Sequence, residues 1–114
     1  MMYKQGDILL IPIPFSDLTS SKRRPVLVLS NSEYNKTTDD LVVAAITSNL
    51  KDRGYTILFT NNDLEVGNLK VDSCIRTDKI YTLSKSIVIK RFGSVKPEVL
   101  ASVKDKIRDL LEDK

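Results

Sequence analysis

Short apolar runs separated by polar segments make up most of this chain, and they predict a structure built mainly from β-strands. The runs that fit strands are residues 7–15, 26–29, 41–46, 55–60, 71–78 and 87–92. The first contains Pro12 and Pro14, and because proline cannot donate to a β-ladder, we expect this strand at the edge of a sheet. The runs 26–29 and 41–46 are apolar at every position, which is typical of strands covered on both faces.

The pattern changes to a helical period after Gly93. Pro97 stands where the first turn of a helix tolerates proline, and Glu98 favours the positive end of the helix dipole. We therefore expect a C-terminal amphipathic helix that packs on the sheet. Together with roughly five or six short strands, this helix implies a small, strongly twisted sheet or a partly open barrel. The apolar residues at helical spacing are Leu100, Val103, Ile107, Leu110 and Leu111.

The size and composition of the chain fit one folded domain spanning residues 1–114. Its 114 residues are 41% hydrophobic and 29% charged, which suffices for a packed interior. No internal repeat, low-complexity segment or linker rich in proline, glycine and serine divides it. The apolar run near the N-terminus has no small-residue cleavage site after it, and nowhere do 18 apolar residues follow one another. We expect a cytoplasmic protein that does not enter a membrane.

The absence of histidine removes much of enzyme chemistry from consideration. The chain has no histidine and one cysteine, which excludes Ser-His and Cys-His pairs, histidine-based zinc sites and internal disulfides. We assign no metal and no cofactor. Cys74 is expected to be a buried or half-buried apolar residue without a role in chemistry. The net charge of +3 is mildly favourable for a polyanion and decides little.

Alternation within the run 71–78 brings two charged residues to one face. Arg76 and Asp78 point the same way along the expected strand, roughly 7 Å apart. Such a pair is either a surface ion pair of little energetic weight or part of a site.

Four segments of the chain stand out together: Gly6-Asp7-Ile8, Arg24-Pro25-Val26-Leu27-Val28-Leu29-Ser30, Ala44-Ala45-Ile46-Thr47-Ser48 and Ile75-Arg76-Thr77-Asp78. In order and spacing they resemble the toxins of the MazF/PemK family. The resemblance covers nearly the whole chain and implies an SH3-like, partly open barrel of the CcdB/PemK type. It also implies a homodimer that cleaves single-stranded RNA as an endoribonuclease, an mRNA interferase, and that a cognate antitoxin protein inhibits.

The same resemblance assigns catalytic roles to individual residues. The family's catalytic arginine falls on Arg24, its strand-end hydroxyl on Thr47 with Ser48 beside it, and the Arg-x-Asp pair of the PemK branch on Arg76 and Asp78. Some members of that branch use a histidine in the first loop. This chain has none, so another group must carry out that proton transfer.

RNA cleavage without a metal requires a base for the 2′-hydroxyl proton, cations for the phosphorane and an acid for the leaving 5′-oxygen. Arg24 offers a planar fork of donors to phosphate oxygens, and Thr47 can donate a hydrogen bond beside it. The resemblance makes Asp78 the general base with Arg76 as its partner, although a neighbouring arginine weakens a carboxylate base by lowering its pKa. Arginine is a poor acid because its pKa exceeds about 12, so no proton donor is assigned.

The loops beside Arg24 and Thr47 carry further candidates for contact with RNA. Their cations can attract the backbone, and an aromatic ring can stack on a base. Two rival functions share the barrel: a toxin that binds DNA gyrase without chemistry of its own, and a catalytically silent SH3-like binding module. The substrate-binding candidates are Ser48, Lys22, Arg23, Lys51, Arg53 and Phe15.

Overall fold

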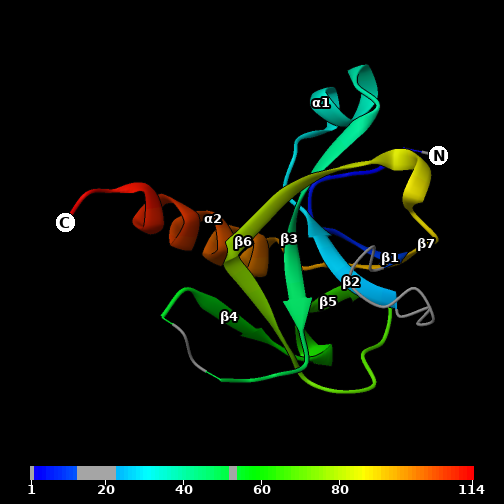
Figure 1. Ribbon diagram of the computed structural model, residues 1–114. Coiled ribbons are helices and arrows are strands. Elements are labelled where there is room, and N and C mark those ends of the chain that lie inside the picture. Colours follow the sequence, from blue (N-terminus) through cyan, green and yellow to red (C-terminus); the bar gives the residue numbers. More distant parts are fainter. Residues whose placement is uncertain (1, 13–22, 52–53) are drawn as a thin grey trace.

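The computed structural model describes residues 2–12, 23–51 and 54–114, and within them the chain forms one curled antiparallel sheet with a long C-terminal helix (Figure 1). The strand order is β4-β6-β3-β2-β1-β7-β5. The predicted fold class, mainly β with a terminal helix, is confirmed. The strands are β1 Asp7–Pro12, β2 Arg23–Val28, β3 Asp40–Thr47, β4 Thr56–Phe59, β5 Leu64–Val66, β6 Ser73–Ser84 and β7 Lys90–Val95; the α-helices are α1 Ser32–Thr37 and α2 Pro97–Leu111, and the 3₁₀ turns are η1 Asn61–Asp63 and η2 Lys85–Ile87.

The prediction that the first strand lies at a sheet edge is wrong. β1 pairs with both β2 and β7, and the outermost strands are β4 and β5. Pro12 is tolerated because it is the last residue of β1, where it faces Arg23, and because the ladder with β7 ends at Leu10. Residues 13–15 of the expected strand, including Pro14, lie outside the described residues.

Two buried apolar clusters lie on opposite faces of the central strands. On one face, α2 packs Val99 and Val103 against Ile8, Leu27 and Phe59. The members of the cluster on the other face are Leu9, Ile11, Val26, Val28, Leu41, Val43 and Leu83. Successive residues of β2 thus enter different clusters, which confirms the prediction of a strand covered on both faces.

The second half of β6 gives the sheet its curl. This strand has 12 residues, pairs with β4 at its N-terminal end and with β3 along most of its length, and bends sharply between the two parts (Figure 1). The sequence pattern predicted a strand over residues 71–78, which covers only residues 73–78 of β6. β5, three residues long and in a segment where no strand was predicted, was also missed. Cys74 is buried, as expected. No helix in the described part of the chain is long and apolar enough to cross a membrane.

Candidate functional site

The sheet register places the main candidate residues on one face, directly beyond the second apolar cluster. Val26 of β2 lies opposite Ala45 of β3, so continuing this register by two residues sets Arg24 opposite Thr47. Ala45 in turn lies opposite Arg76 of β6. Because side chains alternate along a strand, Arg24 and Thr47 project from the same face as Val26 and Ala45.

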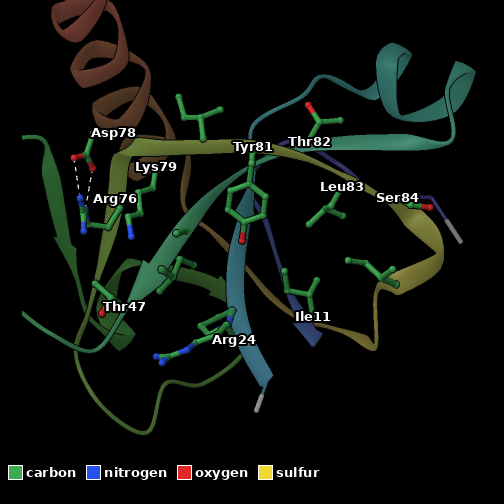
Figure 2. Close-up of a pocket in the computed structure, with 15 residues that line it drawn as sticks. Ile11, Arg24, Thr47, Arg76, Asp78, Lys79, Tyr81, Thr82, Leu83 and Ser84 are labelled. Atoms are coloured by element: carbon green, nitrogen blue, oxygen red, sulfur yellow. Dashed lines mark hydrogen bonds and ion pairs between the residues drawn. The ribbon is translucent and has the colours of Figure 1, made fainter. Parts of the chain in front are cut away.

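These residues line one pocket with a volume of about 1020 Å³ (Figure 2). Arg24, Thr47, Arg76 and Asp78, the four catalytic candidates, all contribute to its wall. Its remaining lining residues are Ile11, Pro25, Ala45, Ile46, Lys79, Ile80, Tyr81, Thr82, Leu83, Ser84 and Ile87. The pocket is therefore charged at the end of Arg76 and Asp78 and more apolar toward Ile11.

A bulge of three residues in β6 shapes the charged end. Arg76 pairs with Ala45 and Ile80 with the adjacent Ala44, so residues 77–79 have no partner in β3. Thr77, fully buried, anchors the bulge to the loop before β4: its backbone N–H and its hydroxyl both donate to the carbonyl of Tyr55, at 3.0 and 2.6 Å. The bulge is thereby held against the neighbouring strand rather than left to move freely.

Arg76 and Asp78 form a two-pronged ion pair within this bulged segment. Nε and Nη2 of Arg76 each lie 2.9 Å from a different oxygen of Asp78. The shared face predicted from alternation is confirmed, with a direct contact. The hydrogen bonds from Arg76 hold the pKa of Asp78 below its ordinary value; partial desolvation opposes this, and the charges of Arg76 and Lys79 lower the pKa further. Asp78 is thus an ionised carboxylate at neutral pH.

Thr47 is half-buried at the end of β3 and its side chain is fixed by the turn that follows. Its hydroxyl oxygen accepts a hydrogen bond from the backbone N–H of Asn49, at 3.1 Å. A hydroxyl that accepts in this way keeps its own proton available for donation. Arg24 is exposed, and its guanidinium forms no ion pair with the described residues. Both groups can therefore donate to an anion in the pocket.

The remaining candidates do not join this cluster. Ser48, Arg23 and Lys51 are exposed and are not among the residues that line the pocket. The last three, Lys22, Arg53 and Phe15, lie outside the described residues.

Two pocket residues were missed by the sequence interpretation. Figure 2 shows Tyr81 projecting from β6 across the pocket toward the side of Arg24, and the amine of Lys79 pointing into the space between Arg76 and Tyr81. Burial raises the pKa of the Tyr81 phenol above its usual value, so the phenol is protonated at neutral pH. The signal that could have found them is the run Ile80, Tyr81, Thr82, which favours a strand continuing past Asp78.

The chemistry of the pocket suits an anion that spreads its charge over several oxygens. Two guanidinium groups, an ammonium and several hydroxyls can donate hydrogen bonds, and one carboxylate can accept a proton. Across residues 2–12, 23–51 and 54–114, no three acidic or cysteine side chains lie close enough together to hold a metal ion. A phosphodiester fits this set of donors.

The fold and the pocket define a small, mainly β protein with a half-barrel sheet, a terminal helix and a cationic site on the sheet face away from that helix. The chain belongs to the family of PemK-like, MazF-like toxins of type II toxin-antitoxin systems, whose profile matches residues 4–111. No curated protein sequence gave a significant match.

Solved structures from Deinococcus radiodurans and from mycobacterial species have a similar fold. The chain resembles a chain of the MazE-MazF crystal structure (Form-III) from Deinococcus radiodurans, with a TM-score of 0.79 and 24% identity over 97% of each chain. It resembles an endoribonuclease from a mycobacterial species with a TM-score of 0.77 and 20% identity, over 97% of this chain and 92% of that one. A mycobacterial endoribonuclease in complex with its cognate antitoxin gives a TM-score of 0.75 and 18% identity, over 96% and 93%. At these identities the likeness concerns the fold.

Proposed function

We propose that this toxin is an endoribonuclease that cleaves single-stranded RNA, including mRNA, without a metal ion and so inhibits translation and growth. The observation that carries the proposal is that one pocket is lined by Arg24, Thr47, Arg76 and Asp78. The sheet register supports it, because the pairing of Val26 with Ala45, continued by two residues, sets Arg24 opposite Thr47 on one face. The description of the related mycobacterial structures as endoribonucleases is consistent with this activity.

In the proposed reaction the substrate supplies its own nucleophile. Asp78 accepts the proton of the 2′-hydroxyl, whose oxygen attacks the neighbouring phosphorus and displaces the 5′-oxygen. Arg24 donates to the phosphate oxygens as negative charge develops on them, and the hydroxyl of Thr47 donates to the same group. Arg76 orients Asp78, and because it also weakens that base, much of the acceleration comes from electrostatic stabilisation of the phosphorane.

The proposal includes two protein partners. One is a cognate antitoxin, as described for the related mycobacterial endoribonuclease. The other is a second copy of this chain, since the family resemblance implies a homodimer. Light scattering on the purified toxin tests the dimer, and co-expression with the protein encoded beside it tests whether growth arrest is relieved.

Incubation of the purified toxin with single-stranded RNA in EDTA tests the activity. We expect cleavage that leaves a 2′,3′-cyclic phosphate or 3′-phosphate and a 5′-hydroxyl, while an otherwise identical DNA strand stays intact because it lacks the 2′-hydroxyl. Equal cleavage of DNA, or a requirement for added magnesium, would contradict the proposed mechanism. A toxin that arrests growth without cutting RNA, and keeps doing so as Arg24→Ala, would instead be a binding protein such as a gyrase poison.

A further inference from the structure

The proposed reaction still needs an acid for the leaving 5′-oxygen, and this chain has no histidine to supply one. The breaking bond releases an alkoxide, which is a poor leaving group unless it is protonated. The guanidinium groups of Arg24 and Arg76 remain protonated in proteins and are poor acids. Any acid must therefore come from another residue of the pocket.

The bulge in β6 sends Lys79 into that pocket. Lys79 is the last of the three residues that lack a partner in β3. Within the bulge, Thr77 is buried and donates a hydrogen bond to the carbonyl of Tyr55, and the carboxylate of Asp78 accepts hydrogen bonds from Arg76. Lys79 lines the pocket, and its ammonium makes no hydrogen bond or ion pair with the described residues.

The direction of the Lys79 side chain is favourable for proton donation. Figure 2 shows its amine pointing into the pocket between Arg76 and Tyr81, toward the side occupied by Thr47 and Arg24. An ammonium carries three donor hydrogens, so it can donate hydrogen bonds to a phosphate oxygen and to the leaving oxygen at the same time. The exposed position of Lys79 also leaves it free to follow the substrate.

The other titratable groups facing Lys79 favour it over the alternatives. Arg24 of β2 and Arg76 of β6 are the other cations that line the pocket and are poor acids, and the carboxylate of Asp78 is assigned as the base. Tyr81 is the remaining possible donor, and partial desolvation raises the pKa of its phenol, which makes it a weaker acid than usual. Among these groups the ammonium is the better-placed acid.

We propose that Lys79 is the general acid of the cleavage reaction, an inference that rests on the proposed ribonuclease function. As the 2′-oxygen bonds to phosphorus and the bond from phosphorus to the 5′-oxygen breaks, Nζ of Lys79 gives one proton to that 5′-oxygen. The products are a 2′,3′-cyclic phosphate and a 5′-hydroxyl. Lys79 is left as a neutral amine and Asp78 as a carboxylic acid, and proton exchange with solvent restores both.

A pair of matched substrates tests this role. One is an RNA oligonucleotide cut by the wild-type toxin, and the other carries sulfur in place of the 5′-oxygen at the cleaved bond. A thiolate leaves without protonation, so the sulfur substrate does not need an acid. The toxins compared are wild type, Lys79→Ala, Lys79→Arg and, as a control, Lys36→Ala on α1, an exposed lysine outside the pocket.

We expect Lys79→Ala to cleave the oxygen substrate about 100-fold or more slowly in single-turnover assays and the sulfur substrate at nearly the wild-type rate. Lys79→Arg should behave in the same way, because a guanidinium keeps the charge but is a poor acid. Lys36→Ala should match wild type on both.

Three results would overturn the assignment while leaving the ribonuclease function in place. Equal slowing of both substrates by Lys79→Ala, or full activity of Lys79→Arg, would mean that Lys79 acts only as a charge. An unchanged rate of Lys79→Ala on the oxygen substrate would mean that Lys79 has no part in the chemistry. If the wild-type toxin cleaves no RNA at all, the proposed function fails together with this inference.

Discussion

The guanidinium of Arg76 donates two hydrogen bonds of 2.9 Å to the carboxylate of Asp78, which follows two residues later in the same strand. Both side chains are only partly exposed, at 17% and 30%, so the pair is shielded from water more than an ordinary surface ion pair. It also lines the candidate site. The two interpretations of the sequence, an ion pair or part of a site, are therefore compatible. In the proposed reaction, the ion pair sets the pH range in which Asp78 is ionised and able to accept a proton.

Replacing Arg76 by methionine tests this control through the pH dependence of cleavage. The hydrogen bonds from Arg76 are the main cause of the low pKa of Asp78, so their loss should move the acidic limb of the kcat/KM profile to higher pH. The maximal rate should also fall, since Asp78 loses its orientation. The same change at Arg108, whose ion pair with Asp105 is exposed on α2, should leave the profile unchanged.

The contribution of the Arg76–Asp78 pair to stability should be lost at acidic pH. Because the pKa of Asp78 is lower in the folded state than in the unfolded state, the pair stabilises the fold above the unfolded-state pKa, and this contribution disappears as pH falls through the folded-state pKa. The melting temperature of Arg76→Met should therefore fall less than that of the wild type as the pH becomes acidic. An identical decline in both proteins would show that the pair does not hold Asp78 ionised.

Arg24→Ala should abolish most of the activity without unfolding the protein. Removing one donor to a developing oxyanion costs roughly 100- to 1000-fold in kcat, and Arg24 can supply two such donors. Arg24→Lys should recover little of this loss, because an ammonium lacks the planar fork. Single-turnover cleavage and the melting temperature are the two measurements, and the melting temperature should hardly move because Arg24 is exposed. Nearly full activity of Arg24→Ala would remove this residue from the site.

Thr47→Val separates the hydroxyl from the shape of the side chain. Valine keeps the β-branched form suited to a strand but removes both the acceptor for Asn49 N–H and the donor to substrate, so we expect roughly a 10- to 100-fold lower kcat. Thr47→Ser retains the hydroxyl and should stay close to wild type. If serine and valine are equally impaired, the methyl group rather than the hydroxyl matters, and Thr47 has only a structural part.

Local patterns were sufficient to predict much of the fold and one contact within the pocket. The proximity of Arg76 and Asp78 was predicted from alternation, because two residues on one face of a strand lie close together, but only the family resemblance assigned the pair to a site. The terminal helix and the buried β2 were found because their apolar periods are long or uninterrupted. Arg24 and Thr47 were singled out by family resemblance, and only the structure shows that they line the same pocket.

What was missed depends on contacts between distant segments. Lys79 and Tyr81 enter the pocket because three residues of β6 bulge away from β3, and neither strand alone encodes that break in register. β1 can be an inner strand although it contains Pro12, because its ladder with β7 stops before that residue. The sequence of β1 does not show where β7 begins and ends. β5 is too short, at three residues, to show a period.

The anchoring of the bulge by Thr77 gives a final prediction, which joins stability to activity. Thr77→Val keeps the volume and branching of a fully buried side chain but removes the 2.6 Å hydrogen bond to the Tyr55 carbonyl. That carbonyl still receives the backbone N–H of Thr77, so it is not left without a partner. We expect the free energy of unfolding in urea to fall by about 1 kcal/mol.

Activity should fall by more than this loss of stability explains. With the hydroxyl bond gone, the bulge can shift, and Arg76 and Asp78 shift with it, so kcat should drop about tenfold under conditions in which the variant is fully folded. KM should change less, because Arg24 and Thr47 come from other strands. Thr77→Ser keeps the hydroxyl and should restore kcat even if it lowers stability through the lost methyl group. Loss of stability with unchanged kcat in Thr77→Val would show that the bulge is held in place by the strand itself and not by this side chain.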